Sequence, residues 1–218
     1  LYQTAINLNP ESRAIDLPDG RAVVEIGAYK GKSTICIALG LLKNKYKYKF
    51  ISIDPLYQDK EHLIYFKNLL KKFKVEEIVE IQDKFSETAF VEWDANFLIN
   101  MLWIDGNHEY EFVSRDFELW SKYLMPNGVI IFHDFYLPGV RQVIHQNILN
   151  SNFFNNLVFI DGNLFSAKKI DYPLSIRDKI IKKKFFLTID TKTNSLLLMI
   201  LIILAKKLIQ FKNLFFIK

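Results

Sequence analysis

The sequence has a single cysteine, Cys36, and only 8 glycines and 6 prolines among its 218 residues. One cysteine cannot form an intrachain disulfide or a zinc site built from several cysteines, and it favours a reducing compartment. The composition, with 50% hydrophobic residues, also excludes a collagen-like repeat, a disulfide scaffold and a disordered chain. No secretory signal is visible, although the chain begins at Leu1 rather than at Met. We therefore expect a cytoplasmic protein built on an α/β domain.

The sequence also lacks an acidic excess, because Lys and Arg outnumber Asp and Glu by 29 to 24. The basic excess is confined to residues 168–218, where 12 Lys or Arg accompany 3 Asp and give a net charge of +9. Residues 1–167 carry 17 basic and 21 acidic side chains, a net charge of −4. Because an acidic body repels a phosphate backbone, we do not expect a nucleic-acid partner. The basic tail needs a separate explanation.

Short apolar runs alternate with longer amphipathic segments up to about residue 170. The pattern predicts strands at 22–26, 50–54, 78–81, 99–105 and 128–133, and helices at 33–42, 59–74, 86–93, 111–124 and 139–150. Such alternation is typical of a parallel sheet with right-handed helical crossovers. Two further strands, 157–160 and 164–167, flank the turn sequence Asp161-Gly162-Asn163 and are predicted to be antiparallel neighbours. The chain is thus predicted to have a domain at 1–170 and an extension at 171–218.

A glycine-containing turn follows the first predicted strand, at the place where open α/β sheets bind ligands. Gly27 and Gly31 permit a tight turn and let a ligand approach the backbone closely. Their spacing fits neither a dinucleotide-binding fold nor a phosphate loop, so an NAD-dependent enzyme is disfavoured. Asp54 ends the second strand, where an acidic side chain can accept both hydroxyls of a ribose. Together these features favour a nucleoside site over a purely structural turn.

Acidic and imidazole side chains follow the fourth and fifth predicted strands. Asp105 and His108 come after the fourth strand, and His133 and Asp134 end the fifth. Buried strands seldom end in such groups without a use, because removing them from water is costly. Asp105, His133 and Asp134 are placed to converge on one divalent cation, and His108 is placed to act as a general base near neutral pH. The structural alternative for each histidine is a satisfied loop residue.

Four groups of residues resemble, in their order, the motifs of class I S-adenosylmethionine (SAM)-dependent methyltransferases. They are Glu25-x-Gly27-x-x-x-Gly31-x-Ser33, Asp54, Ile104-Asp105-Gly106-x-His108-x-Tyr110 and Asn127-Gly128-x-x-x-x-His133-Asp134. The resemblance covers about residues 20–168 and is strongest to methyltransferase domain family 24, which includes macrolide-sugar O-methyltransferases; the glycine turn is also similar to catechol O-methyltransferase. It implies a doubly wound, seven-stranded, mostly parallel Rossmann-like sheet with an antiparallel final hairpin and a helical C-terminal extension.

The resemblance also implies roles for individual residues. The cofactor SAM would be bound by Glu25, Gly27, Tyr29, Gly31, Ser33, Asp54 and Ser86, with Asp54 on the ribose hydroxyls and Ser86 near the adenine. A divalent metal, Mg²⁺ or Mn²⁺, would be held by Asp105, His133 and Asp134, and His108 would be the catalytic general base. Relatives that use a metal usually carry a carboxylate at the position of His133. This departure leaves two alternatives: no metal, or a preference for an imidazole-tolerant ion such as Mn²⁺ or Fe²⁺ over Mg²⁺.

These assignments favour an enzyme that O-methylates a hydroxyl of a sugar or another small molecule, with a small-molecule or glycan acceptor as its partner. Acceptor-binding segments are expected at 1–20, at 135–140 and in the tail. Two alternatives stay open: a non-catalytic binding protein that kept the methyltransferase fold, and an RNA or protein methyltransferase. The latter is favoured only by the sequence pI of about 9.1. Against it stand the acidic body and the missing Asn/Asp-Pro-Pro-Tyr-type motif of enzymes that methylate exocyclic amines.

The C-terminal extension combines basic and apolar segments. Lys182-Lys183-Lys184 precede an uninterrupted apolar run at 196–205, and further lysines follow it. Ten apolar residues are about half of what a spanning helix needs, so a transmembrane span is disfavoured. The main alternatives for the extension are a helix packed on the domain or on a second subunit of a homo-oligomer, and a helix lying on the cytoplasmic face of a membrane; a disordered tail and a true insertion are less favoured. We expect peripheral membrane contact, because lysines are attracted to an anionic lipid surface.

Overall fold

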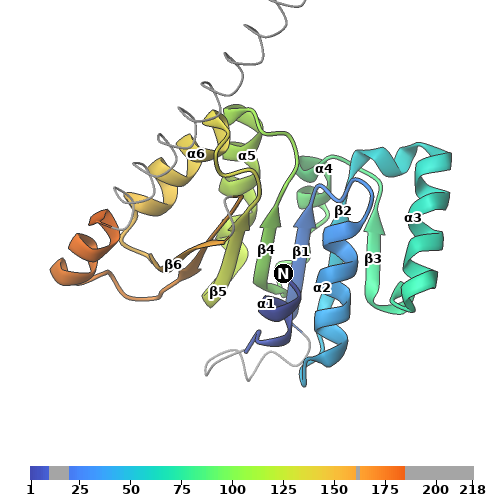
Figure 1. Cartoon of the computed structure of the whole chain (residues 1–218), viewed down its shortest axis with the longest axis horizontal. Coiled ribbons are helices and arrows are strands. Elements are labelled where there is room, and N and C mark those ends of the chain that lie inside the picture. Colours follow the sequence, from blue (N-terminus) through green and yellow to red (C-terminus); the bar gives the residue numbers. More distant parts are fainter. Residues whose placement is uncertain (10–19, 161–162, 185–218) are drawn as a thin grey trace, which may run out of the picture. The chain divides into compact units, whose positions relative to one another are not determined.

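The computed structural model describes residues 1–9, 20–160 and 163–184. The chain consists of two compact units, which are Leu1–Leu174 and Ser175–Lys218. The first unit contains the sheet (Figure 1). By their residue numbers, all of the predicted site residues also belong to it. The apolar run at 196–205 lies outside the described residues, so its membrane role stays a prediction.

The strands of the described residues form one seven-stranded sheet in the order β3-β2-β1-β4-β5-β7-β6. Their bounds are β1 (Arg21–Ile26), β2 (Lys49–Ile53), β3 (Val79–Gln82), β4 (Leu98–Ile104), β5 (Leu124–Phe132), β6 (Phe154–Ile160) and β7 (Leu164–Lys169). Strands β1 to β5 pair in parallel, whereas β7 is antiparallel to both β5 and β6. The predicted mostly parallel sheet with an antiparallel final hairpin is confirmed.

Helices cover both faces of this sheet (Figure 1). They are α1 (Tyr2–Ile6), α2 (Lys32–Lys43), α3 (Lys60–Phe73), α4 (Ser86–Val91), α5 (Tyr110–Trp120) and α6 (Pro138–Val143), with short helical segments η2 (Pro55–Gln58), η3 (Glu76–Ile78), η4 (Ser121–Tyr123) and η5 (Ile144–Leu149). On one face, Phe66 of α3 is buried in the same cluster as Trp103 of β4 and Ile131 of β5. Phe132 follows Ile131 and therefore points to the opposite face, where its ring lies 6.4 Å from that of Phe117 in α5.

The largest departure from the predicted boundaries lies between α5 and β5. The sequence predicts a helix up to 124 and a strand from 128, but α5 ends at Trp120 and β5 begins at Leu124. Pro126-Asn127-Gly128 has the composition of a turn, and Asn127 does adopt a φ of +64°. The strand nevertheless runs through this segment, because the register against β4 shifts there and absorbs the irregularity.

The fold brings the ends of four strands to one edge of the sheet. The register aligns the last residues of β2, β1, β4 and β5, which are Ile53, Ile26, Ile104 and Phe132. The next residues along the chain are Asp54, Gly27, Asp105 and His133. Because parallel strands all run in the same direction, three polar residues and a glycine from four distant segments meet at this edge.

The second unit is described only as far as residue 184. Residues 176–184 are helical, and the side chains of Ile176, Ile180 and Ile181 are exposed. Within the described ranges, no helix combines the length and hydropathy needed to cross a membrane.

Candidate active site

The loop after β1 meets the end of β4 at a contact that only glycine permits. Gly27 has a φ of +82°, and a Cβ atom added there would lie 2.2 Å from the carbonyl oxygen of Asp105. The Gly27 N–H donates to the carbonyl of Ile53 (2.9 Å), and the Asp105 N–H donates to the carbonyl of Ile26 (2.8 Å). The ends of β1, β2 and β4 are thereby joined, and the glycine loop lies directly beside Asp105.

The carboxylate of Asp54 holds the same loop from the end of β2. One of its oxygens accepts the N–H groups of Ala28 (2.9 Å) and Tyr29 (2.7 Å), and the other accepts the N–H of Leu56 (2.8 Å). The side chain lines a cavity although Asp54 is only 4% exposed. A carboxylate has about four acceptor sites, so Asp54 can hold the loop and still accept a hydroxyl of a ligand.

Glu25 lies beneath the loop rather than in the cavity. One of its oxygens accepts the hydroxyls of Thr34 (2.6 Å) and Ser52 (2.7 Å), and the other has no hydrogen-bond partner among the described residues. Complete burial raises the pKa of Glu25 to about 7 in spite of these hydrogen bonds. Of the residues predicted to bind the cofactor, Glu25, Gly31 and Ser33 do not line the cavity, whereas Gly27, Tyr29, Asp54 and Ser86 do.

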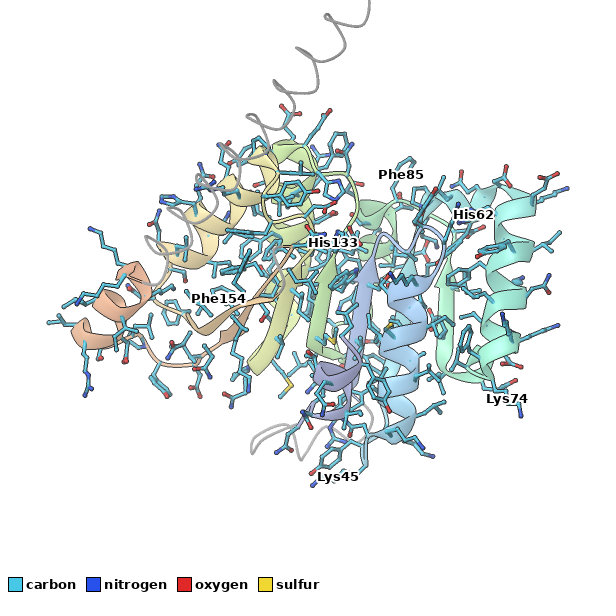
Figure 2. All side chains as sticks on the ribbon, viewed as in Figure 1. Lys45, His62, Lys74, Phe85, His133 and Phe154 are labelled. Carbon is cyan, nitrogen blue, oxygen red and sulfur yellow. The ribbon has the colours of Figure 1, made fainter. Side chains whose placement is uncertain are left out.

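The cavity has a volume of about 540 Å³ and opens at the carboxyl ends of the strands. Its walls are formed by Ile26, Gly27, Tyr29, Ile53, Asp54, Pro55, Leu56, Phe85, Ser86, Glu87, Asp105, Gly106, Asn107, His108, Phe112, Asp116, His133 and Asp134. The hydroxyl of Ser86 donates to the carboxylate of Asp116, whose burial raises its pKa to about 6. Figure 2 shows Phe85 and His133 at the same edge of the sheet, opposite the edge that carries Lys45.

Asp105, His108, His133 and Asp134 form a cluster in this cavity, and all four side chains are half-buried. Nε2 of His108 lies 3.4 Å from the Asp105 carboxylate and 3.2 Å from that of Asp134. Nδ1 of His133 lies 3.0 Å and 3.3 Å from the same two carboxylates. The four candidate ligand atoms all lie within 4.8 Å of one another. The structure therefore brings together the three predicted metal ligands and the predicted base.

The local backbone and the charges both shape this cluster. Asp134 adopts a φ of +50°, in the left-handed region that residues other than glycine rarely occupy. Backbone strain of this kind is common where a side chain must be aimed at a functional site. The short contact with Asp105 raises the pKa of His133, against the opposing effect of partial burial. The carboxylates of Asp105 and Asp134 thus favour the protonated, positively charged form of the His133 imidazole.

Sequence reasoning missed three polar side chains around the cavity. Asn163, predicted only as a turn residue, places its side-chain amide 3.0 Å from Nε2 of His133. Asp116 lines the cavity directly. His62 contacts a residue of the cavity wall, because its Nε2 lies 2.6 Å from the carbonyl oxygen of Tyr29. Asp116 could have been found, because it is an acidic residue on the buried face of an amphipathic helix. No local pattern marks the other two.

A family model with the description "Methyltransferase domain" matches residues 24–135, slightly more than half of the chain. The matched segment contains the end of β1, all of β2 to β5, and every residue predicted to bind a cofactor or metal or to act as a base. The match therefore covers the sheet edge and most of the cavity described above.

Two uncharacterised proteins are related in sequence. A protein of Acanthamoeba polyphaga mimivirus is 33% identical over 138 residues, which are 58% of this chain and 60% of that protein. A protein of Sinorhizobium fredii is 26% identical over 132 residues, which are 52% of this chain and 13% of that protein. The matches thus span less than two thirds of the length of each relative.

Solved structures of methyltransferases share the fold. The O-methyltransferase TomG from Streptomyces achromogenes, involved in tomaymycin synthesis and solved with SAM, has a TM-score of 0.57 at 15% identity, over 78% of this chain and 79% of that chain. An O-methyltransferase from Bacillus cereus, solved with SAH, has a TM-score of 0.54 at 14% identity, over 76% and 86% of the two chains. At such identities the likeness shows a Rossmann-like methyltransferase fold and nothing finer.

Proposed function

The chain belongs to the methyltransferase-domain family, and from this premise we propose that it is a SAM-dependent O-methyltransferase that acts on a hydroxyl of a sugar or another small molecule. One observation carries the proposal: Asp54 and the glycine loop share a cavity with the cluster of Asp105, His108, His133 and Asp134. A methyl donor and a hydroxyl acceptor must lie in contact before transfer, and a shared cavity supplies that proximity.

The nucleoside side of the cavity is the proposed SAM site. When bound, SAM supplies an electrophilic methyl group attached to a sulfonium. Asp54 would accept the ribose hydroxyls, as an acidic residue at this strand end does in nucleotide-binding α/β folds. Gly27 keeps the loop free of a side chain on the wall of the cavity. Ser86 and Asp116 lie at the same cavity and would face the adenine side.

His108 is the proposed general base. As the new O–C bond forms and the S–C bond breaks, the acceptor hydroxyl gives its proton to His108, so the products are a methyl ether, SAH and a protonated imidazole. The carboxylates of Asp105 and Asp134, at 3.4 Å and 3.2 Å from Nε2 of His108, stabilise that imidazolium. The base must be within hydrogen-bond reach of the acceptor, and His108 lines the cavity where an acceptor would bind.

The same cluster fits a divalent cation. Ligand atoms at about 2.0–2.2 Å from a metal lie about 3–4 Å from one another. The distances of 3.0 Å and 3.3 Å from Nδ1 of His133 to the carboxylates of Asp105 and Asp134 match that spacing. We propose Asp105, His133 and Asp134 as the ligands. A cation held there would supply positive charge next to the acceptor oxygen. His108 stays outside the proposed ligand set, because a ring nitrogen that binds a metal cannot also accept a proton.

The cavity supports a small acceptor. Its volume of about 540 Å³ falls in the usual range of small-molecule sites, about 300–1,000 Å³, and SAM would occupy part of it, so a small acceptor fits better than a large one. Phe85 and Phe112, which are 60% and 44% exposed as residues, both line it, so apolar surface is available for an acceptor at its mouth. Aromatic walls with a few convergent polar groups are typical of sites that orient small ligands.

Two measurements test the function. Calorimetric titration of the full chain with SAM and with SAH should show saturable binding, and its absence would favour a non-catalytic protein. Transfer of a labelled methyl group from SAM should then occur to members of a panel of sugars and catechols, and not to RNA or protein. If only RNA or protein became labelled, the result would contradict a small-molecule acceptor and favour an RNA or protein methyltransferase.

A substitution of His108 tests its role separately. His108→Gln should lower turnover by about 10²–10⁴, the usual loss for a general base, and leave SAM affinity nearly unchanged. His145→Gln serves as the matched control, because His145 is exposed and does not line the cavity. Equal turnover of the two variants at saturating acceptor would assign the proton transfer to another group.

A further inference from the structure

The two histidines of the cluster each present a ring nitrogen without a hydrogen bond. Nδ1 of His133 and Nε2 of His108 lie 3.0–3.4 Å from carboxylate oxygens, but neither atom forms a hydrogen bond of acceptable geometry with a described residue. These nitrogens therefore approach the carboxylates without pointing at them. For Nδ1 of His133, such an arrangement is expected when it surrounds a common point together with the two carboxylates instead of bonding to them. Nε2 of His108, outside the proposed ligand set, stays available to accept a proton.

Asn163 contacts the opposite nitrogen of the His133 ring. Its side-chain amide nitrogen lies 3.0 Å from Nε2, while its side-chain oxygen is buried and has no hydrogen-bond partner among the residues that the structure describes. The oxygen and nitrogen of an amide exchange places by a half-turn of the side chain, and the hydrogen-bond network decides between the two orientations. With the oxygen toward His133, it accepts the Nε2–H, and the lone pair of Nδ1 is left facing Asp105 and Asp134.

The backbone fixes this contact. The N–H of Phe135, just after Asp134, donates to the carbonyl oxygen of Asn163 (3.3 Å). The antiparallel pairing of β5 with β7, in which Phe132 lies opposite Phe165, brings the start of β7 to the end of β5. Asn163 is thus held beside His133 by two independent features of the fold.

We propose that Asn163 holds His133 with Nδ1 free as a metal ligand, and that this imidazole makes the site select a first-row transition metal such as Co²⁺ or Fe²⁺ over Mg²⁺. The inference rests on the proposed function, which places a cation in the cluster. Mg²⁺ prefers oxygen ligands and gives up water reluctantly, whereas imidazole nitrogen suits the later transition metals. A ligating histidine whose other N–H is accepted by a neighbouring group keeps the correct tautomer.

The experiment measures binding of Co²⁺ alone and of Mg²⁺ alone to the full chain, without SAM, by calorimetry and by the visible absorption of Co²⁺. Wild type should bind Co²⁺ at least about tenfold more tightly than Mg²⁺. His133→Asp should reduce or reverse this preference and shift the Co²⁺ absorption, because a nitrogen ligand is replaced by oxygen. Equal or tighter binding of Mg²⁺ by wild type would overturn the proposal.

Asn163 is tested by a pair of variants. Asn163→Ala should weaken Co²⁺ binding by about tenfold or more, and Asn163→Asp, which still accepts the Nε2–H, should restore it. Unchanged or tighter Co²⁺ binding by Asn163→Ala would mean that the amide donates to Nε2 and opposes ligation. SAM affinity should be the same in all variants, so a failure of this inference is distinguishable from a failure of the proposed function.

Discussion

Gly139, in the first turn of α6, lies directly against the backbone of His108. A Cβ atom added to Gly139 would lie 2.3 Å from the carbonyl oxygen of His108 and 2.5 Å from the backbone nitrogen of Tyr110. Both distances are far below van der Waals contact, and both neighbours are backbone atoms that cannot rotate away. The start of α6 therefore sets the position of the loop that carries the proposed base.

Gly139→Ala should lower the turnover number and leave the affinity for SAM nearly unchanged. The added methyl group displaces the His108 loop, and a misplacement of about 1 Å at a catalytic group can cost about 10²-fold in rate. SAM affinity should change little, because Gly27 and Asp54 follow β1 and β2, whereas the His108 loop follows β4. Steady-state kinetics and SAM titration measure the two effects. Gln142→Ala, at an exposed position of the same helix, is the control; equal rates of the two variants would show that the loop tolerates the shift.

Asp54→Ala should weaken SAM binding by about 1–3 kcal/mol, because hydroxyl donors of the ligand and N–H donors of the loop lose their acceptor. Calorimetry of the folded variant measures the dissociation constant. Asp94→Ala is a matched control: its carboxylate also accepts a backbone N–H, from Asn96 at 2.9 Å, but it does not line the cavity. An unchanged dissociation constant for Asp54→Ala would remove this residue from the cofactor site.

Glu25 should make the protein less stable as the pH rises. Its carboxyl group ionises near pH 4.5 when unfolded and near 7 when folded, so the folded state binds more protons between these values. The free energy of unfolding therefore falls as the pH rises from about 4.5 through about 7, by up to about 3 kcal/mol. Urea unfolding across this range measures the slope.

Glu25→Gln should flatten that slope, because the amide keeps the hydroxyl contacts and does not titrate. The comparison with wild type is necessary, since burial also raises the pKa of Asp116, to about 6, and adds a change of the same sign. Parallel stability curves for wild type and Glu25→Gln would contradict a raised pKa at Glu25.

The sheet and most of the cavity could be predicted because local patterns encode them. Buried parallel strands are continuous apolar runs, and three of the central runs here are followed directly by a polar residue, Asp54, Asp105 or His133. Once the strands are known to be parallel, these residues must meet at one edge. The grouping of His133 with Asp105 follows from that step alone, without knowledge of any side-chain contact.

The remaining features depend on contacts between distant segments or on burial. Asn163 reaches His133 only because β7 inserts between β5 and β6, and no local pattern encodes that insertion. Glu25 belongs to the glycine motif, yet its side chain points to Thr34 and Ser52 beneath the loop. The order of residues places Glu25 near the loop, but the face on which its side chain lies is a property of the packed sheet.

The described part of the second unit carries apolar side chains among basic ones. Ile176, Ile180 and Ile181 are 79%, 52% and 55% exposed; the spacing of four residues puts Ile176 and Ile180 on one side of the helix, and Ile181 borders that side. The basic residues of this segment are Arg177, Lys179, Lys182, Lys183 and Lys184. Apolar residues bordered by lysine and arginine are the pattern of helices that lie in a lipid interface.

We therefore predict that the full chain sediments with vesicles of phosphatidylcholine and phosphatidylserine at low salt. Each lysine near an anionic surface contributes about 1 kcal/mol, and salt screens that attraction, so binding should weaken at high salt. Ile180→Asp combined with Ile181→Asp should release the protein, because the apolar contact is replaced by negative charge. Val91→Asp, at an apolar position of the first unit that is 84% exposed, should leave sedimentation unchanged. Wild type that stays in the supernatant at low salt would assign the extension to contacts between proteins instead of a membrane.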